Sequence, residues 1–272
     1  MTETVGIIGL GSLGALMARA FSEEGFDVVG FDVDDKRVAD VVGGPIRPAS
    51  SPAAVAKESD VVVVVVGTSE QVESVLFGPD GVTTGATGTV TVAITSTVHP
   101  NACTDWATRF ESSGDLVDAP IARGPLIPDR GAVALFGGPD TVVARLTPMF
   151  EAAIGATVHL GRVGAGQCGK LVNNQLFWTC HLANVEAVRV AKAFGIESEV
   201  LLDALTRGSG DNYALHRWGA VSDDWVADDL DKTLALAGAL GLNVPLTEKV
   251  RELYDGIELN QAWRLLDDAE SQ

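Results

Sequence analysis

The sequence predicts an α/β fold in which a doubly wound parallel-sheet domain, residues 1–162, precedes an all-helical domain, residues 163–272. Three observations lead to this prediction. Strand and helix patterns alternate through the first half, a glycine-rich turn follows the first strand, and nothing after residue 162 has a strand pattern. Such alternation is typical of a parallel sheet with helices on both faces. With 272 residues, 46% of them hydrophobic, the chain is long enough to bury a core in each domain.

The predicted strands are short apolar segments bounded by turn residues. The most apolar of them, a run of valines, is far too short to cross a bilayer and is typical of a strand buried on both faces. The helix Leu13–Glu24 follows the first strand, and two later segments, Ala132–Phe136 and Thr157–Leu160, are expected to extend the sheet. The main strands are Thr4–Ile8, Asp27–Asp32, Asp60–Val66, Val90–Ile94 and Leu116–Ala119.

The second half reads as helices only. A long helix, Ala165–Phe194, ends at a glycine and is expected to connect the two domains, where ligand clefts are common. Three shorter helices are predicted after it, at Ser198–Thr206, Trp225–Leu240 and Leu246–Ile257.

The first chemical motif is the sequence Gly-Leu-Gly-Ser-Leu-Gly at residues 9–14. It follows a strand and opens a helix, which is the context that a dinucleotide-binding, Rossmann-like turn requires. The first glycine permits the tight turn, the second lets the backbone approach a pyrophosphate, and the third lets helix and strand pack closely. The helix N-terminus adds N–H groups and a positive dipole end. We therefore assign cofactor binding to Gly9, Leu10, Gly11, Ser12, Leu13 and Gly14.

An acidic residue at the predicted end of the second strand indicates which cofactor binds. A carboxylate at Asp32 accepts hydrogen bonds from the ribose hydroxyls of NAD and repels a 2′-phosphate. Asp34 and Asp35 add negative charge, whereas Lys36 and Arg37 are able to reach a 2′-phosphate. The sequence therefore predicts NAD and leaves NADP as the alternative.

Charge and cysteine usage exclude several classes of partner. The net charge is −18, with 37 acidic against 19 basic residues, which argues against nucleic acid or an anionic membrane as a partner. The three cysteines and four histidines lack metal-ligand spacing, so we predict no metal site. No signal-peptide pattern begins the chain, and we expect a cytoplasmic protein. Many carboxylates and few lysines are typical of proteins from salt-filled cytosols, which predicts a halophilic origin.

Five motifs, in order along nearly the whole chain, resemble one family, the β-hydroxyacid dehydrogenases. They are residues 9–14, Ser96–Pro100, Asp118–Ile121, Gly164–Asn174 and Leu230–Ala237. This family includes 3-hydroxyisobutyrate dehydrogenase, tartronate semialdehyde reductase and sulfolactaldehyde reductase. The resemblance implies hydride transfer between nicotinamide and a small anionic β-hydroxy acid, or its aldehyde or keto form. It also implies a site between the two domains and a homodimer or homotetramer.

Lys170 is the expected general acid/base. It lies early in the long helix, and Asn174, four residues on, projects from the same face. A lysine accepts a hydroxyl proton when its pKa falls from about 10.4 toward neutrality. A partly desolvated cleft, with Lys232 and a positive nicotinamide nearby, would lower it. By the resemblance, Asn174 hydrogen-bonds the substrate and helps to fix the lysine.

Other residues receive roles from the resemblance. Lys232 reaches the cofactor and closes the cleft, although Thr233 stands where the family usually has an aspartate. Ser96 and Thr97 follow a strand whose carboxyl end faces the nicotinamide, so their hydroxyls can bind the cofactor amide and the substrate, or cap the next helix. Gly67 is counted with the cofactor-binding residues.

The clearest departure from the family pattern is Ala122-Arg123-Gly124, where the family usually has Ser-Gly-Gly. A hydroxyl is lost and a guanidinium is gained, and a guanidinium binds a carboxylate or sulfonate through two parallel bonds. This version resembles the sulfolactaldehyde reductases. We assign Arg123 and Gly124 to the substrate, and Trp178 either lines the cleft or packs in the core.

Two other functions stay open at this point. One is a same-fold reductase of imines, or of an aldehyde such as sulfolactaldehyde or succinic semialdehyde. Lysine at position 170 favours oxygen chemistry, because imine reductases usually lack it there. The other is a non-catalytic NAD-binding protein. A short-chain dehydrogenase is excluded, because neither Tyr213 nor Tyr254 is followed four residues later by lysine.

The acidic composition generates a prediction about salt. Raising KCl from about 0.1 M to about 1 M shortens the Debye length from about 10 Å to about 3 Å and screens carboxylate repulsion. We expect the Tm, measured by differential scanning fluorimetry, to rise by several degrees. Sucrose at matched osmolality is the control for solute exclusion. A Tm that stays flat or falls with KCl contradicts the prediction.

Overall fold

The computed structural model describes residues 3–41, 46–86, 90–218 and 225–255. Contacts divide the chain into two compact units, Met1–Lys170 and Leu171–Gln272. The division falls inside one long helix. Within the described ranges, no helix is both long and apolar enough to cross a membrane.

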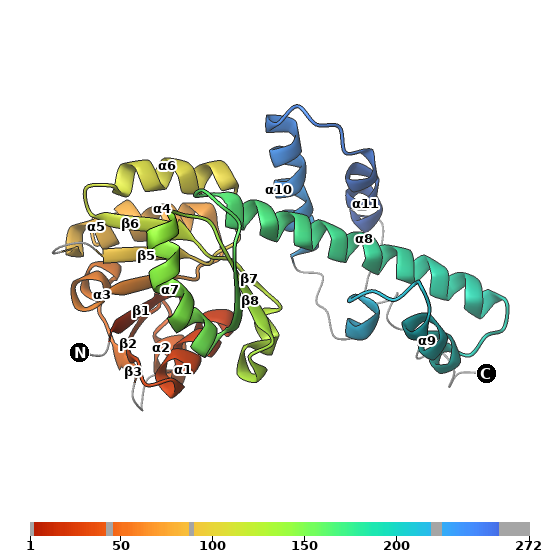
Figure 1. Cartoon of the computed structure of the whole chain (residues 1–272), viewed down its shortest axis with the longest axis horizontal. Coiled ribbons are helices and arrows are strands. Elements are labelled where there is room, and N and C mark those ends of the chain that lie inside the picture. The colour runs from red at the N-terminus through yellow and green to blue at the C-terminus, as the bar shows by residue number, and fades with distance from the viewer. Residues whose placement is uncertain (1–2, 42–45, 87–89, 219–224, 256–272) are drawn as a thin grey trace. The chain divides into compact units, whose positions relative to one another are not determined.

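The first unit is built on a six-stranded parallel sheet in the order β3-β2-β1-β4-β5-β6 (Figure 1). This order confirms the predicted Rossmann-like fold. The strand order reverses beside β1, and in such sheets ligands bind at that switch point, outside the carboxyl ends of the strands. The strands are β1 Thr4–Ile8, β2 Asp27–Phe31, β3 Ile46–Pro48, β4 Val61–Val64, β5 Val90–Ile94 and β6 Gly114–Asp118.

Helices cover both faces of this sheet, which explains the run of valines in β4. Val61 and Val63 belong to one buried cluster and Val62 and Val64 to the other, and all four are fully buried. Because side chains alternate along a strand, both faces of β4 must be apolar. One face is covered by α1 Ser12–Glu23, α2 Asp35–Val41 and α7 Asp140–Ala153. The other is covered by α3 Pro52–Glu58, α4 Ser69–Phe77, α5 Val82–Gly85 and α6 Pro100–Phe110.

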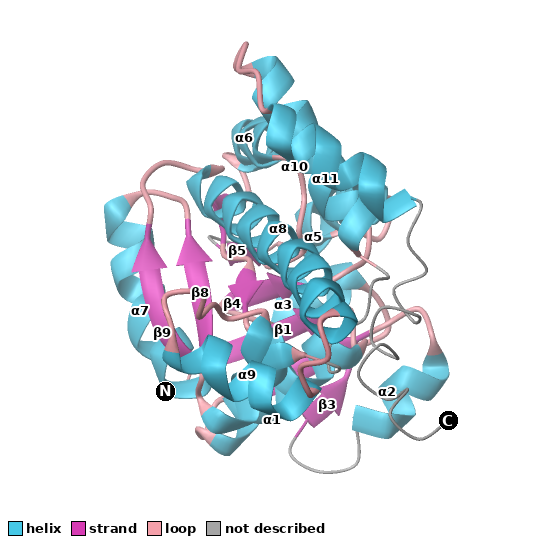
Figure 2. Cartoon of the chain, turned by 90° about the vertical axis from the view of Figure 1, so that its right-hand side faces the viewer, coloured by secondary structure: helices cyan, strands magenta, loops and turns pink. Residues whose placement is uncertain are grey.

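The two later strand segments do not extend the main sheet, so that expectation was wrong. β8 Ala132–Phe136 pairs antiparallel with β7 Ile121–Ala122 and parallel with β9 Gly155–His159, and the three strands form a second sheet. Figure 2 shows β8 and β9 side by side. After β6 the chain passes through Pro120, whose carbonyl accepts the N–H of Leu135 at 3.0 Å, and enters the second sheet. A single bridge between Asp118 and Gly137 joins the two sheets.

The second unit is helical, as predicted. Its core contains residues from α8, α10 and α11, among them Trp178, Leu182, Leu230 and Tyr254. The helix bounds agree with the sequence prediction to within two residues wherever the chain is described, and Ile257, the predicted end of the last helix, lies outside the described residues. The helices are α8 Ala165–Ala193, α9 Ser198–Arg207, α10 Val226–Ala239 and α11 Pro245–Asp255.

Candidate active site

The glycine loop after β1 has the geometry that the motif predicts. Gly9 has a φ of +96°, and a Cβ there would collide with the carbonyl oxygen of Val65. A Cβ at Gly14 would collide with the carbonyl oxygen of Gly9, so α1 packs directly on the turn. The N-cap residue of α1 is Gly11, which has no side chain with which to cap the helix. The N–H groups in the first turn of α1 are therefore available to bind an anion.

A hollow of about 310 Å³ lies beside this loop. If Gly11 had a Cβ, the one atom within 4 Å of it would be the Nη1 of Arg37, at 3.8 Å. The space beside the Gly11 backbone is therefore open, and a ligand can approach this backbone closely. This open backbone at a helix N-terminus fits the pyrophosphate of a dinucleotide. The hollow is lined by Leu10, Gly11, Ser12, Ala15, Arg19, Arg37, Asp40 and Val41.

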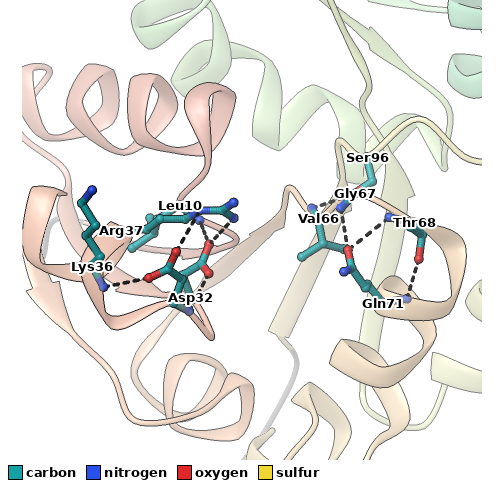
Figure 3. A network of polar contacts seen from close by, with 10 residues as sticks. Leu10, Asp32, Lys36, Arg37, Val66, Gly67, Thr68, Gln71 and Ser96 are labelled. Carbon is teal, nitrogen blue, oxygen red and sulfur yellow. Dashed lines mark hydrogen bonds and ion pairs between the residues drawn. The ribbon is translucent and has the colours of Figure 1, made fainter. Parts of the chain in front are cut away.

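Asp32 holds this loop from the end of β2 (Figure 3). One carboxylate oxygen accepts the N–H of Leu10 at 2.7 Å, and the other accepts the N–H of Asp34 at 2.9 Å. The carboxylate is buried, and Arg37 lies 3.5 Å from it and 3.6 Å from Asp34. Arg37, a candidate from the sequence for binding a 2′-phosphate, is thus paired with two carboxylates at the edge of the hollow.

A second group of contacts joins the carboxyl ends of β4 and β5 (Figure 3). The Ser96 hydroxyl accepts the N–H of Val66 at 2.8 Å, and the Gln71 side chain accepts the N–H groups of Gly67 and Thr68 at 2.8 and 3.2 Å. Ser96 is buried, so in this structure its hydroxyl joins two loops.

Ser96 and Thr97 do not cap the next helix, which excludes the alternative role considered for them. The N-cap of α6 is His99, whose Nδ1 accepts the N–H of Asn101 at 3.2 Å. Pro100 at the first helical position fixes the start of the helix, so the cap falls at His99, two residues after Thr97. Thr97 is half-buried in the loop between β5 and this helix.

A fully buried carboxylate, Asp118 at the end of β6, binds the N-terminus of α8. Its Oδ1 accepts the N–H of Gly164 at 2.6 Å, and its Oδ2 accepts the N–H of Gln167 at 2.7 Å. Burial raises the pKa of Asp118 to about 6, and these backbone hydrogen bonds oppose the rise by stabilising the ionised form. The carboxylate supplies, from a distant strand, the cap that α8 lacks in its own sequence.

Glycines make this close approach possible. A Cβ at Gly137 would lie 2.5 Å from one Asp118 oxygen, and a Cβ at Gly166 would lie 2.8 Å from the other. Gly164 adopts a φ of +91°, which a side chain rarely tolerates. The sequence Gly-Ala-Gly at residues 164–166 is thus explained by its close contact with the Asp118 carboxylate.

Gln167 ties the same helical turn to the loop after β5. It is fully buried; its Oε1 accepts the N–H of Val98 at 3.0 Å, and its Nε2 donates to the carbonyl of Ser96 at 2.8 Å. Lys170 follows three residues later and is half-buried. The first turn of α8 is therefore fixed to β6 and to the Ser96–Val98 loop.

In the second unit, a buried carboxylate holds Asn174. The Nδ2 of Asn174 donates to Asp229 at 2.8 Å, and the indole N–H of Trp178 donates to the same oxygen at 3.0 Å. Asn173 donates to the Oδ1 of Asn174 at 3.0 Å. Trp178 is 6% exposed and belongs to the core of the helical unit. The Asn174 side chain is thus oriented by hydrogen bonds to two neighbouring side chains.

Lys232 lies on α10 and forms an ion pair with Asp228, one turn away on the same helix. Thr233, which replaces the expected aspartate, donates its hydroxyl to the carbonyl of Asp229 at 2.9 Å. It also lies 3.5 Å from the carbonyl of Leu171. The threonine therefore joins α10 to α8 without adding a charge.

Arg123 occupies the turn that departs from the family pattern. It is exposed and has a φ of +56°, in the left-handed region that favours glycine. A Cβ at Gly124 would lie 2.9 Å from the Cδ1 of Leu13, so this turn lies against the first turn of α1. Arg130, at the other end of the 3₁₀ helix Gly124–Asp129, is also left-handed and pairs with Glu24.

The structure brings together part of the predicted site within the first unit. The glycine loop, Asp32, Gly67 and Ser96 lie around the carboxyl ends of β1, β2, β4 and β5. Asn174, Trp178 and Lys232 belong to the second unit. Among the described residues, no group of three His, Cys, Asp or Glu side chains is arranged to hold a metal ion.

Three residues of this arrangement were missed by reasoning from the sequence. Asp118 and Gln167 lie within two of the five motifs but have no predicted role of their own, and Asp229 lies outside all five. The sequence did contain a signal for Asp118. This acidic residue ends a strand and lies two residues before Pro120, so its side chain is placed where the chain leaves the sheet and can contact another element. Neither Gln167 nor Asp229 has a comparable signal, since both lie within ordinary helical patterns.

Comparison with known proteins agrees with this geometry. A family model described as the NAD binding domain of 6-phosphogluconate dehydrogenase matches residues 4–164. Another, described as the NAD-binding of NADP-dependent 3-hydroxyisobutyrate dehydrogenase, matches residues 164–269. The fold and the loop geometry define a dinucleotide-binding oxidoreductase. The chain belongs to the β-hydroxyacid dehydrogenases, a family of NAD(P)-dependent enzymes.

Individual relatives include enzymes with different substrates. The chain is 27% identical to 3-sulfolactaldehyde reductase of Escherichia coli strain K12, covering 92% of this chain and 88% of that protein. It is 30% identical to the NAD-dependent L-serine dehydrogenase of Pseudomonas aeruginosa, covering 78% and 72%. A solved structure of Mycobacterium tuberculosis 3-hydroxyisobutyrate dehydrogenase with L-serine has the same fold, with a TM-score of 0.85 at 22% identity and full coverage of both chains.

The contacts of Asp229 generate a prediction about stability. Asp229→Ala leaves the Asn174 amide and the Trp178 indole N–H without this acceptor, and the free energy of unfolding should fall by about 1–3 kcal/mol. Urea denaturation measures it. Asp231→Ala, which lies on the same helix as Asp229 and removes an exposed ion pair with Arg251 of α11, is the control and should cost less than about 1 kcal/mol. Equal losses in the two variants would contradict the assignment.

Proposed function

We propose that this chain transfers a hydride between NAD and a small anionic β-hydroxy acid, or its aldehyde or keto form, with Lys170 as general acid/base. The observation that carries the proposal is the placement of Lys170 in α8, three residues after Gln167. Gln167 is bonded to the loop that follows β5, at the ligand-binding edge of the sheet. NAD, when bound, accepts or supplies the hydride.

The proton is handled by the chain's own residues. In oxidation, the neutral amine of Lys170 accepts the proton of the substrate hydroxyl, and in reduction its ammonium donates a proton to the carbonyl oxygen. Asn174, held by Asp229, follows one helical turn later and orients the substrate oxygen through its amide. An amide already fixed by a buried carboxylate loses little freedom when substrate binds.

The proposal names NAD as the preferred cofactor. The negative charge of Asp32, at the end of β2 beside the glycine loop, disfavours a 2′-phosphate there. Arg37 lies at the same place, but its guanidinium is paired with Asp32 and Asp34. The Pseudomonas aeruginosa relative named as NAD-dependent supports this preference. Steady-state assays with NAD and NADP side by side measure it.

The substrate is proposed to carry a carboxylate or a sulfonate that binds Arg123. A non-glycine residue in the left-handed region costs about 1–3 kcal/mol and is typical of functional sites. Gly124 packs on Leu13, which places the Arg123 turn beside the cofactor loop. The Escherichia coli relative, a 3-sulfolactaldehyde reductase by name, supports a sulfonate as one such anion.

We further propose a cytoplasmic homodimer or homotetramer in a salt-rich cell. The net charge of −18 supports the high salt. Val190 and Phe194, near the end of α8, are 72% and 85% exposed, which supports association through the helical unit.

The role of Lys170 is tested by replacement with alanine. Lys170→Ala should lower kcat by about 100-fold or more, because proton transfer loses its acid/base. NADH binding, followed by fluorescence titration, should change little. Turnover is measured in molar KCl on 3-hydroxyisobutyrate, 3-hydroxypropionate, glycerate, threonate, 4-hydroxybutyrate and dihydroxypropanesulfonate. Lys192→Ala, on the same helix, is the matched control, and retained turnover in Lys170→Ala would falsify the mechanism.

The role of Arg123 is tested with glycine, which removes the guanidinium and relieves the left-handed backbone. Arg123→Gly should keep or raise the Tm, yet lower kcat/KM for the preferred anionic substrate by about 10- to 100-fold, the value of a charged hydrogen bond. Arg130→Gly is the matched control, since it removes the other left-handed arginine of the same segment. An equal loss of kcat/KM in both variants, or none in Arg123→Gly, would contradict the assignment.

A further inference from the structure

A continuous set of hydrogen bonds connects three segments that are distant in the sequence. Asp118, at the end of β6, accepts the N–H groups of Gly164 and Gln167, and Gln167 bonds to Ser96 and Val98 after β5. The backbone of Val66, after β4, donates to the Ser96 hydroxyl. The carboxyl ends of β5 and β6 are therefore joined through the first turn of α8, and the Ser96 hydroxyl joins the end of β4 to that of β5.

Lys170 lies directly beyond this turn. Three residues along an α-helix correspond to a rise of about 4.5 Å, and residues three apart lie on the same face. Gln167 and Lys170 are so related, and Gln167 is completely buried with three polar partners. A shift of the first turn would carry the lysine with it, since a helix moves as a rigid element over one turn.

We propose that Asp118 and Gln167 are positioning residues for hydride transfer, holding Lys170 in register with the Ser96–Val98 loop through the first turn of α8. The inference rests on the proposed function, since it requires Lys170 to be the acid/base. Neither residue touches the reacting atoms in this assignment. Asp118 fixes the helix along its axis by capping it, and Gln167 fixes it against the loop after β5.

The Asp118 carboxylate must be ionised to act in this way. Each oxygen faces an N–H donor, at 2.6 and 2.7 Å. A protonated carboxyl turns one oxygen into a donor, and that donor would then face another donor. The groups facing Asp118 are the N–H groups of Gly164, Gly166 and Gln167 from the α8 side, and the Cys103 thiol from α6. Burial, followed by the charge of Asp118, raises the pKa of that thiol, so it stays neutral.

This arrangement predicts a pH effect that separates Asp118 from Lys170. In the reducing direction Lys170 must be protonated, so its titration limits activity on the alkaline side. The pKa of Asp118 lies at about 6, so activity should also fall on the acid side as the pH drops through this value and the cap is lost. Asp118→Asn, which cannot titrate, should lack the acid limb and keep the alkaline one.

The test uses two variants of the full chain, assayed with NADH and the carbonyl form of the preferred substrate. Asp118→Asn places an amide N–H against an N–H donor, and Gln167→Met keeps the volume but removes every hydrogen bond of the side chain. We expect each to lower kcat by about 10- to 100-fold, the effect of misplacing a catalytic group by about 1 Å. Gln167→Met carries the test if Asp118→Asn does not fold.

Ser51→Ala is the matched control, because Ser51 caps α3 by accepting the N–H of Ala54 at 3.1 Å and lies outside this network. It should lower the Tm and leave kcat unchanged. The inference is overturned if folded Asp118→Asn and Gln167→Met change only the Tm, as the control does, or if Asp118→Asn keeps the acid limb. Turnover by Lys170→Ala would instead overturn the proposed function, so the two failures are distinguishable.

Discussion

The contact between the Asp118 carboxylate and the first N–H groups of α8 is the constraint on which the rest of the first unit depends. A buried charge without partners is strongly unfavourable, so the chain must bring donors to within hydrogen-bond distance on both oxygens. Two glycines, Gly137 and Gly166, leave room for that approach, and Gly164 supplies the left-handed turn before the helix. The long helix begins where it does because the carboxylate caps it there.

A second buried carboxylate applies the same physical logic in the helical unit. Asp229 accepts the amide of Asn174 and the indole N–H of Trp178, both of which lie on α8. The two α8 residues with proposed roles at the reaction centre are thus fixed from outside their own helix, Lys170 through the backbone and Asn174 through its side chain. Thr233 stands where the family usually has an aspartate, and its hydroxyl contacts the carbonyl groups of Asp229 and Leu171 in the same region.

Most of the fold was predictable because it depends on local periodicity. The valine run of β4, the glycine turn at Gly9 and the length of α8 each follow from one segment of sequence. Local patterns do not say which strands pair, and so the second sheet was mistaken for an extension of the first. β3 could not be predicted, because it is only three residues long and largely exposed, too short for an alternation of apolar and polar residues to be recognised. Asp118, Gln167 and Asp229 were missed because the side chain of each bonds to partners that lie 46 to 73 residues away in the sequence, in other elements.

The left-handed Arg123 shows why departures from a family pattern are informative about function. At a position where the family usually has glycine, an arginine adds strain to the native state and removes backbone freedom from the unfolded chain, so its net effect on stability is small or negative. Arg130, at the other end of the same segment, has the same conformation, so left-handed geometry alone does not mark a functional residue. What distinguishes Arg123 is its neighbour: Gly124 packs on Leu13 in the cofactor loop. The recognition of an anion by Arg123, proposed above, would offset the cost of that strain.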